Sequence, residues 1–220
     1  MKSNFYVFRI AKGNDGGSIK SECPIDFHKK ENEIREKLKD IEVDEIEYNG
    51  WVYEWLHNEL WQCGKLRQGW GIEGLDLRID MNDWIRNYIL GAKKYWGVDI
   101  QDNYCEIAMG RYNILKVMLD MKNDDIIFIP KHSQNNHHNE NYFTICKVIG
   151  NYYFDLNGKI KDFGHVIPVK IIGTFKYGNG IDGIDFSGYY SKAISKIEKH
   201  HSLYEKIEQF IKNNLLGNVK

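Results

Sequence analysis

The sequence lacks the short motifs that mark several large enzyme classes. It contains no Gly-x-Ser-x-Gly, no His-Glu-x-x-His and no phosphate-binding P-loop, so the usual serine-hydrolase, zinc-peptidase and P-loop chemistries are not indicated. Glu-x-Lys, which is common in the cores of metal-dependent nucleases, does not occur either. These absences favour a non-catalytic protein, and we predict no catalytic residue.

An excess of one charge and a long apolar run are also missing. Thirty basic residues balance 31 acidic ones, leaving a net charge of −1, whereas a general polyanion binder would show a basic excess. A local basic groove is still compatible with this balance. No apolar run approaches membrane-spanning length, and residues 1–17 lack the apolar region of a signal peptide. We therefore expect a cytoplasmic protein with no membrane partner.

Metal and cofactor signatures are weak. The four cysteines are far apart and form no Cys-x-x-Cys, which favours reduced thiols over a disulfide frame or a zinc site. Three histidines in the polar segment 132–138 are better explained as a solvated loop than as metal ligands. Residues 178–183, GNGIDG, match a dinucleotide fingerprint in letters, but no βαβ pattern surrounds them. We expect neither a metal nor a cofactor. The cysteines are Cys23, Cys63, Cys105 and Cys146.

What the sequence does contain is a clear order of helical and extended segments. Apolar spacing predicts a first strand, several helices, a compact run of strands and a closing helix. This order is typical of an α+β fold, with the late strands forming a small, strongly bent or closed sheet. The predicted strands are 5–10, 124–130, 142–149, 151–155 and 165–177, and all but 151–155 are expected in one mixed or antiparallel sheet. The predicted helices are 34–41, 51–63, 82–97, 106–121 and 189–216.

Several segments together resemble the EVE and YTH members of the PUA-like superfamily. The resemblance rests on "GRYNILKVMLDMKNDDIIFIPK", "NYFTICKVIGNYYFD" and "HVIPVKIIGTF", and in the first part on "FYVFRIAKGND" and "RQGWG". Asn123-Asp124 stands where that family has glycine. The resemblance implies a bent mixed sheet or small barrel surrounded by helices, in one domain over 1–220. It leaves about 15–60 as a helical insertion and about 189–216 as an added C-terminal helix.

The resemblance implies that a tryptophan walls a pocket for a modified base. Trp70, between two glycines, corresponds to it, and His165 falls near a second pocket aromatic of YTH domains, as an exposed imidazole. The residues support this reading independently, because an extruded base needs an aromatic wall, polar groups for its edge and cations for flanking phosphates. Arg111, Asn113 and Lys131 supply the polar and cationic groups. Alternatively, Trp70 is a core residue and Arg111 pairs with a carboxylate.

The sequence therefore predicts non-catalytic recognition of a modified or flipped nucleotide, with DNA favoured over RNA. Related domains occur in modification-dependent restriction systems, so the resemblance implies a defence role with an effector nuclease or motor protein as partner. Two alternatives stay open. One is an enzyme acting on nucleic acid or nucleotides, and the other is a protein-interaction module that uses the many tyrosines and the last helix.

Overall fold

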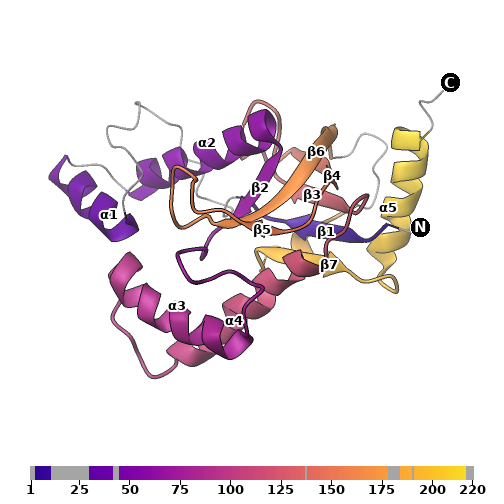
Figure 1. The fold of residues 1–220 in the computed structure, drawn as a ribbon. Coiled ribbons are helices and arrows are strands. Elements are labelled where there is room, and N and C mark those ends of the chain that lie inside the picture. The colour runs from indigo at the N-terminus through magenta and orange to yellow at the C-terminus, as the bar shows by residue number, and fades with distance from the viewer. Residues whose placement is uncertain are drawn as a thin grey trace.

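The computed structural model describes residues 3–10, 30–41, 45–136, 138–177, 184–189 and 191–216. The GNGIDG segment and His137 lie outside these residues. The described chain forms the α+β arrangement drawn in Figure 1. Its helices are α1 (Glu31–Asp40), α2 (Glu45–Cys63), α3 (Met81–Trp96), α4 (Tyr104–Leu115) and α5 (Ser202–Ile211), and its strands are β1 (Phe5–Phe8), β2 (Lys65–Gln68), β3 (Ile126–Pro130), β4 (Tyr142–Val148), β5 (Tyr153–Phe154), β6 (His165–Lys176) and β7 (Ile194–Ile197).

The described strands form one curled, mixed sheet. Its order is β2-β6-β4-β3-β1-β7, and β5 also pairs with β6. Strand β1 runs parallel to β3, while the other pairs are antiparallel. The predicted strands 124–130, 142–149 and 165–177 thus join the first strand in one mixed sheet, as expected. A shift in pairing between Ile145 and Cys146 leaves Ile172 of β6 as an extra residue, which increases the bend of the long strand.

Both faces of the sheet are buried, which explains the continuous apolar runs in its central strands. Alternate residues of β1 divide between the two sides. Tyr6 and Phe8 belong to a core built with helices α1 to α4, which we call the first core. Phe5 and Val7 belong to a smaller core covered by α5, which we call the second core. Figure 1 shows α5 set apart from the other helices.

Helix α3 is delimited by two local signals. The Asp80 side chain accepts a hydrogen bond from the amide of Asn82 at the N-terminus, and Gly97 ends the helix in a left-handed conformation with φ 66°. Trp84, Tyr88, Ala92 and Tyr95 form its buried stripe at helical spacing. The predicted helix 82–97 is therefore confirmed within one residue, and its spacing points Tyr88 into the protein.

The C-terminal region differs from the prediction of a helix over 189–216. Residues 194–197 instead form β7, which pairs antiparallel with β1. After β7 the chain becomes helical at Ser202, with the His201 side chain accepting a hydrogen bond from the amide of Leu203. The apolar residues Ile194 and Ile197 fit a helical spacing locally, but the open edge of β1 offers a full set of backbone hydrogen bonds. Tertiary pairing therefore decides the conformation.

Two other helix boundaries also differ from the expectation. The helix predicted over 106–121 spans Tyr104–Leu115, and Lys116–Asp120 continues as a tighter 3-10 turn. The helix predicted from residue 51 begins at Glu45. Helix α1 and most of α2 fall in the segment expected as an insertion, of which residues 11–29 and 42–44 lie outside the described chain. Among the described helices, none combines the length and apolar character needed to cross a bilayer.

Candidate functional site

The segment after β2 holds Trp70 in an unusual backbone conformation. Trp70 has φ 60°, in the left-handed region that residues with a β-carbon seldom adopt. The following residue, Gly71, donates its amide to the carbonyl of Asp162 at 2.7 Å and accepts from the amide of Gly164 at 3.2 Å. A β-carbon on Gly71 would lie 2.6 Å from the nitrogen of Gly164, so this contact requires glycine. The tight crossing of the two segments fixes the position of the tryptophan.

The guanidinium of Arg111, from α4, lies over the Trp70 ring. Its central carbon is 4.7 Å from the Trp70 ring centroid and 5.3 Å from that of Tyr88 on α3. This is cation–π geometry with two rings. The guanidinium forms no hydrogen bond or ion pair with any residue that the structure describes. Partial burial lowers the pKa of Arg111, an effect opposed by the charge of Asp162. A half-buried cation thus keeps its hydrogen-bond donors available.

Further aromatic side chains surround this pair. The indole of Trp96 donates to a carboxylate oxygen of Asp162 at 2.9 Å, and its ring centroid is 5.2 Å from that of Tyr88. Tyr88 also stacks on Trp84 at 5.3 Å. The buried hydroxyl of Tyr88 has no hydrogen-bond partner among the described residues. We call Trp70, Tyr88, Trp96, Arg111 and Asp162 the aromatic–arginine cluster.

His165 supports this cluster from inside the protein. Its side chain is fully buried, rather than exposed as expected from the sequence. The Nε2 atom lies 3.2 Å from the carbonyl oxygen of Trp70, which can only accept, so Nε2 carries the proton. The Nδ1 atom then accepts from the hydroxyl of Tyr152 at 2.9 Å. Burial lowers the pKa of His165 to about 4, which keeps the ring neutral. Both nitrogens are occupied, so the imidazole holds Trp70 in place.

Asn113 and Lys131 are placed differently. Asn113 is exposed on α4, and its two-residue separation from Arg111 turns it away from that side chain. Lys131 lies in the turn after β3, with φ 55°. Its ammonium pairs with the carboxylate of Glu140 at 2.7 Å. The structure therefore brings together Trp70, Arg111 and His165, whereas Asn113 faces elsewhere and Lys131 is held by Glu140.

The sequence reasoning missed Tyr88, Trp96 and Asp162. Tyr88 belongs to the buried stripe of α3, and Trp96 lies in the last turn of that helix, so each fits an ordinary packing role. Asp162 precedes the Phe-Gly-His segment but has no motif of its own. The excess of aromatic residues was the available signal, and it did not indicate which rings meet.

A buried arginine anchors the loop that carries Asp162. The Arg67 side chain of β2 is 1% exposed and pairs with Glu59 at 2.8 Å and with Asp155 at 2.7 Å. It also donates to the carbonyl oxygen of Phe163 at 3.0 Å. Burial opposes ionisation of Asp155, but hydrogen bonds from Asn157 and Arg67 lower its pKa. Every nitrogen of this guanidinium donates a hydrogen bond within the fold.

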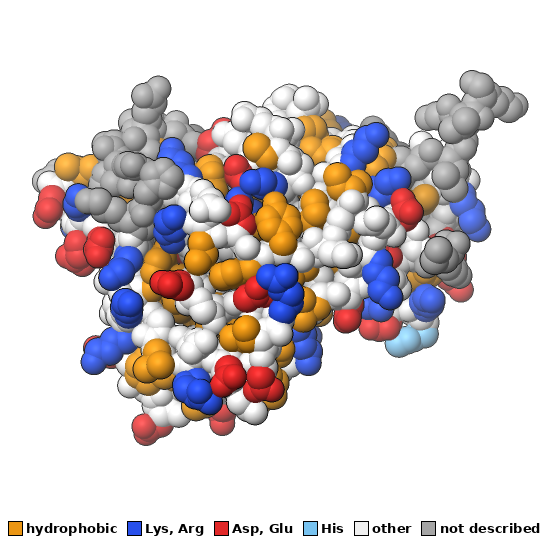
Figure 2. All heavy atoms as spheres, in the orientation of Figure 1, with side chains coloured by type: hydrophobic (Ala, Val, Ile, Leu, Met, Phe, Trp, Pro, Cys, Tyr) orange, Lys and Arg blue, Asp and Glu red, His pale blue; other side chains and the backbone are white. Residues whose placement is uncertain are grey.

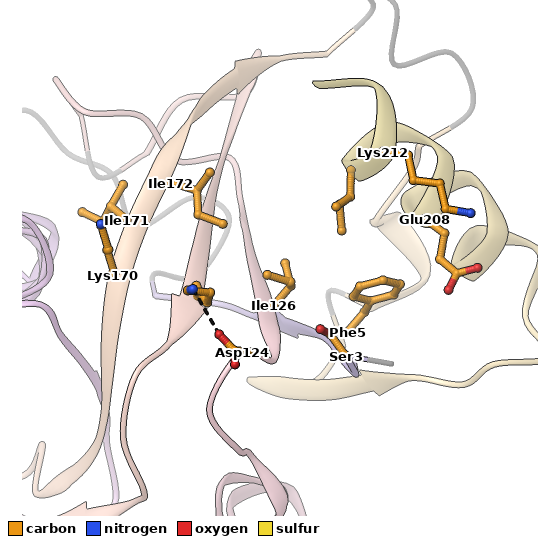
Figure 3. Close-up of a pocket in the computed structure, with 11 residues that line it drawn as sticks. Ser3, Phe5, Asp124, Ile126, Lys170, Ile171, Ile172, Glu208 and Lys212 are labelled. Carbon is orange, nitrogen blue, oxygen red and sulfur yellow. Dashed lines mark ion pairs between the residues drawn. The ribbon is translucent and has the colours of Figure 1, made fainter. Parts of the chain in front are cut away.

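A separate hollow of about 600 Å³ lies between α5 and the sheet (Figure 3). Its walls include Ile126 and Ile172, and Lys147 pairs with Asp124 at 3.1 Å beside them. In Figure 3, Lys170 lies on the opposite side of β6 from Ile172, and Lys212 extends along α5 beside Glu208. The charged groups around this hollow therefore do not converge on one point. Nothing in its lining selects an occupant.

The described residues contain no group of three or more His, Cys, Asp or Glu side chains arranged to hold a metal ion. Of the three loop histidines, His132 is buried, with Nε2 3.0 Å from Nδ1 of His57 and Nδ1 2.8 Å from the hydroxyl of Thr144. His138 lies near Glu140. Cys146 is buried in the first core, while Cys63 and Cys105 are exposed free thiols.

In comparisons with protein-family models, curated proteins and solved structures, the chain matched none of them. The fold and the site therefore define only a structural class. It is an α+β protein with a curled mixed sheet and an aromatic site in which one arginine has hydrogen-bond donors available for a ligand.

Proposed function

We propose that the protein is a non-catalytic reader of a modified or flipped nucleotide, with DNA favoured over RNA as the ligand. In this proposal it uses a PUA-like, EVE/YTH-like fold. The aromatic–arginine cluster is the binding site in this proposal. The observation that carries it is the guanidinium of Arg111, which lies over Trp70 and Tyr88 without a hydrogen bond or ion pair to any described residue. The curled mixed sheet with flanking helices is compatible with the fold but is a coarser feature.

An arginine in this position is suited to nucleotide recognition. A guanidinium that stacks on a ring keeps its donors in its own plane, and a planar fork binds a phosphate or the O6/N7 edge of a guanine through two parallel hydrogen bonds. The half-buried Trp70 adds an aromatic wall, and its indole N–H makes no hydrogen bond to any described residue. The cluster therefore offers both stacking and polar contacts to one base.

The distribution of surface charge favours contact with a few nucleotides over contact with a long stretch of nucleic-acid backbone. Figure 2 shows basic, acidic and hydrophobic side chains interspersed over one face of the molecule. With a net charge of −1, the chain lacks the excess of cations needed to follow many phosphates. Recognition would then depend on one extruded nucleotide and its neighbours.

No observation on the described residues favours the enzyme or protein-interaction alternatives, so neither is proposed.

The proposal is tested by titrating modified and unmodified oligonucleotides, single- and double-stranded, at two salt concentrations. Trp70→Ala should weaken binding roughly 5- to 150-fold, the usual effect of losing one aromatic stack. Arg111→Ala should weaken binding and, if the contact is a phosphate, reduce the slope of log affinity against log salt by about 0.7 on a single strand. Arg86→Ala on α3, an exposed arginine paired with Asp83, is the matched control and should bind as wild type.

Folding of each variant is checked by near-ultraviolet circular dichroism. If Trp70→Ala unfolds the protein, Arg111→Ala carries the test, because the guanidinium forms no hydrogen bond or ion pair with the described fold. If the wild type prefers no oligonucleotide over a bulk control at low salt, the reader function is wrong.

A further inference from the structure

A second pocket adjoins the aromatic–arginine cluster. Its volume is about 380 Å³, which is within the usual range for small-molecule sites. It lies between α3, the turn after β2 and the loop between β5 and β6. Ile72, Tyr95 and Leu156 form its apolar part. Ile72 reaches the helix because position 91 is glycine, where a β-carbon would lie 2.4 Å from the Cδ1 atom of Ile72.

Three lysines line the same pocket. The ammonium of Lys161 donates to the carbonyl oxygen of Leu156 at 2.7 Å, which holds it in place and leaves two of its three N–H groups. Lys94 makes no hydrogen bond or ion pair with a described residue, and Lys30 is 3.9 Å from Glu33. The lining includes a single acid, Glu73, so three positive charges against one negative leave an excess of two.

We propose that this pocket binds a small phosphate monoester whose ring or sugar rests on Ile72, Tyr95 and Leu156. A phosphate monoester is close to a dianion at neutral pH, which matches the excess of two positive charges. Lysines bind phosphate as point charges without a fixed fork, so three of them around an apolar floor accept it in several orientations. The occupant is therefore an organic phosphate. Inorganic phosphate lacks the ring or sugar that would contact Ile72, Tyr95 and Leu156.

Several residues that line the pocket are chain neighbours of residues in the aromatic–arginine cluster. Ile72 follows Gly71, whose backbone crosses the Asp162 segment, and Lys161 directly precedes Asp162. Tyr95 precedes Trp96 on α3. The two sites are therefore built on the same backbone segments and on the same helix. A ligand in the pocket should therefore change the fluorescence of nearby tryptophans, which supplies a readout.

The test uses phenyl phosphate as the probe, with phenol and inorganic phosphate as comparisons, followed by tryptophan fluorescence and calorimetry on the whole chain. Phenyl phosphate should bind more tightly than either comparison compound. Lys94→Gln should weaken it roughly tenfold, or about 1.4 kcal/mol. Lys93→Gln is the matched control, because Lys93 is equally exposed in the same helical turn but does not line the pocket. Glu73→Gln should strengthen binding.

Equal binding of phenyl phosphate by the Lys94→Gln and Lys93→Gln variants would overturn the proposal, as would equal binding of phenol and phenyl phosphate. Displacement of phenyl phosphate by an oligonucleotide with internal phosphates only would assign the pocket to a nucleic-acid backbone and also overturn it. These outcomes are independent of the reader function, because they do not require binding at Trp70. Displacement by mononucleotides or sugar phosphates, without displacement by the oligonucleotide, supports a free organic phosphate.

Discussion

Two arginines of this protein show how surroundings decide the role of a side chain. Arg67 is enclosed by Glu59, Asp155 and a backbone carbonyl, so its donors are used by the fold. Arg111 lies over two rings and has no hydrogen-bond or ion-pair partner among the described residues. Arg67 can therefore only stabilise the fold, while Arg111 can bind a ligand without breaking an existing hydrogen bond or ion pair.

Gly71 gives the first prediction at the residue scale. Gly71→Ala should destabilise the protein by roughly 2–4 kcal/mol, because the new β-carbon meets the backbone of Gly164 and forces the two segments apart. Urea unfolding measures the change. Gly110→Ala on α4 is the control: nothing lies within 4 Å of its β-carbon position, so alanine should raise stability by up to about 1 kcal/mol. Equal effects of the two substitutions would contradict the close crossing at Gly71.

His165 predicts a pH dependence of stability. The unfolded chain binds the imidazole proton near the ordinary pKa of 6.5, and the native protein only near pH 4. Between these values the unfolded state binds more protons, so the free energy of unfolding falls as the pH decreases through this window. At about 1.4 kcal/mol per pKa unit, the loss from this residue is about 3 kcal/mol. The loss stops below about pH 4.

The measurement is urea unfolding at several pH values for the wild type and His165→Gln. Glutamine keeps one donor and one acceptor but does not titrate. The stability difference between the two proteins should shrink by about 3 kcal/mol from pH 7 to pH 4. A difference that stays constant would show that the imidazole is not held neutral.

At the scale of elements, the loop between β5 and β6 depends on β2 through Arg67. Arg67→Met should cost about 3–5 kcal/mol, because it leaves the carboxylates of Glu59 and Asp155 partly buried without their main partner. It should also weaken any ligand binding at Asp162 and Trp96. Arg78→Met is the control, since Arg78 is 60% exposed and pairs with Asp76 at the surface, and its effect should stay within about 0.5 kcal/mol. A change in Arg67→Met as small as in the control would show that the network does not hold the loop.

Several elements could be predicted from the sequence, and others could not. The strands at 126–130, 142–148 and 165–176 were predicted because β-forming residues gather there between connections that carry Asn, Gly and His. Helix α3 was predicted from a helical pattern that ends near Gly97. Strand β7 was missed because its four residues fit a helical spacing as well as an extended one. The short 3-10 turn after α4 was missed because its apolar residues continue the helical spacing.

At the scale of the whole molecule, the sheet has helices on both faces, and the tryptophans are on one side only. All six tryptophans, at 51, 55, 61, 70, 84 and 96, belong to or pack on the first core. Phe143 belongs to the second core under α5. Because the same strands supply both cores, we expect them to unfold together, and tryptophan fluorescence should report damage to a core that contains no tryptophan.

Phe143→Ala should therefore shift the fluorescence transition and the far-ultraviolet circular dichroism transition in urea equally, by about 3–5 kcal/mol. Ile149→Ala is the control, because Ile149 is 52% exposed and its loss should be small. A dichroism transition that moves while the fluorescence transition does not would mean that the two cores unfold separately.

The sequence by itself determined the α+β class, the central strands, the buried stripe of α3 and the two side chains that meet at the cluster, Trp70 and Arg111. These depend on local spacing, on turn residues and on the chemistry of individual side chains. Tertiary structure alone decided that the two side chains meet and that His165 is buried beneath Trp70. It also decided that residues 194–197 are a strand. Each of these outcomes depends on contacts between segments far apart in the chain, whose energies no local pattern contains.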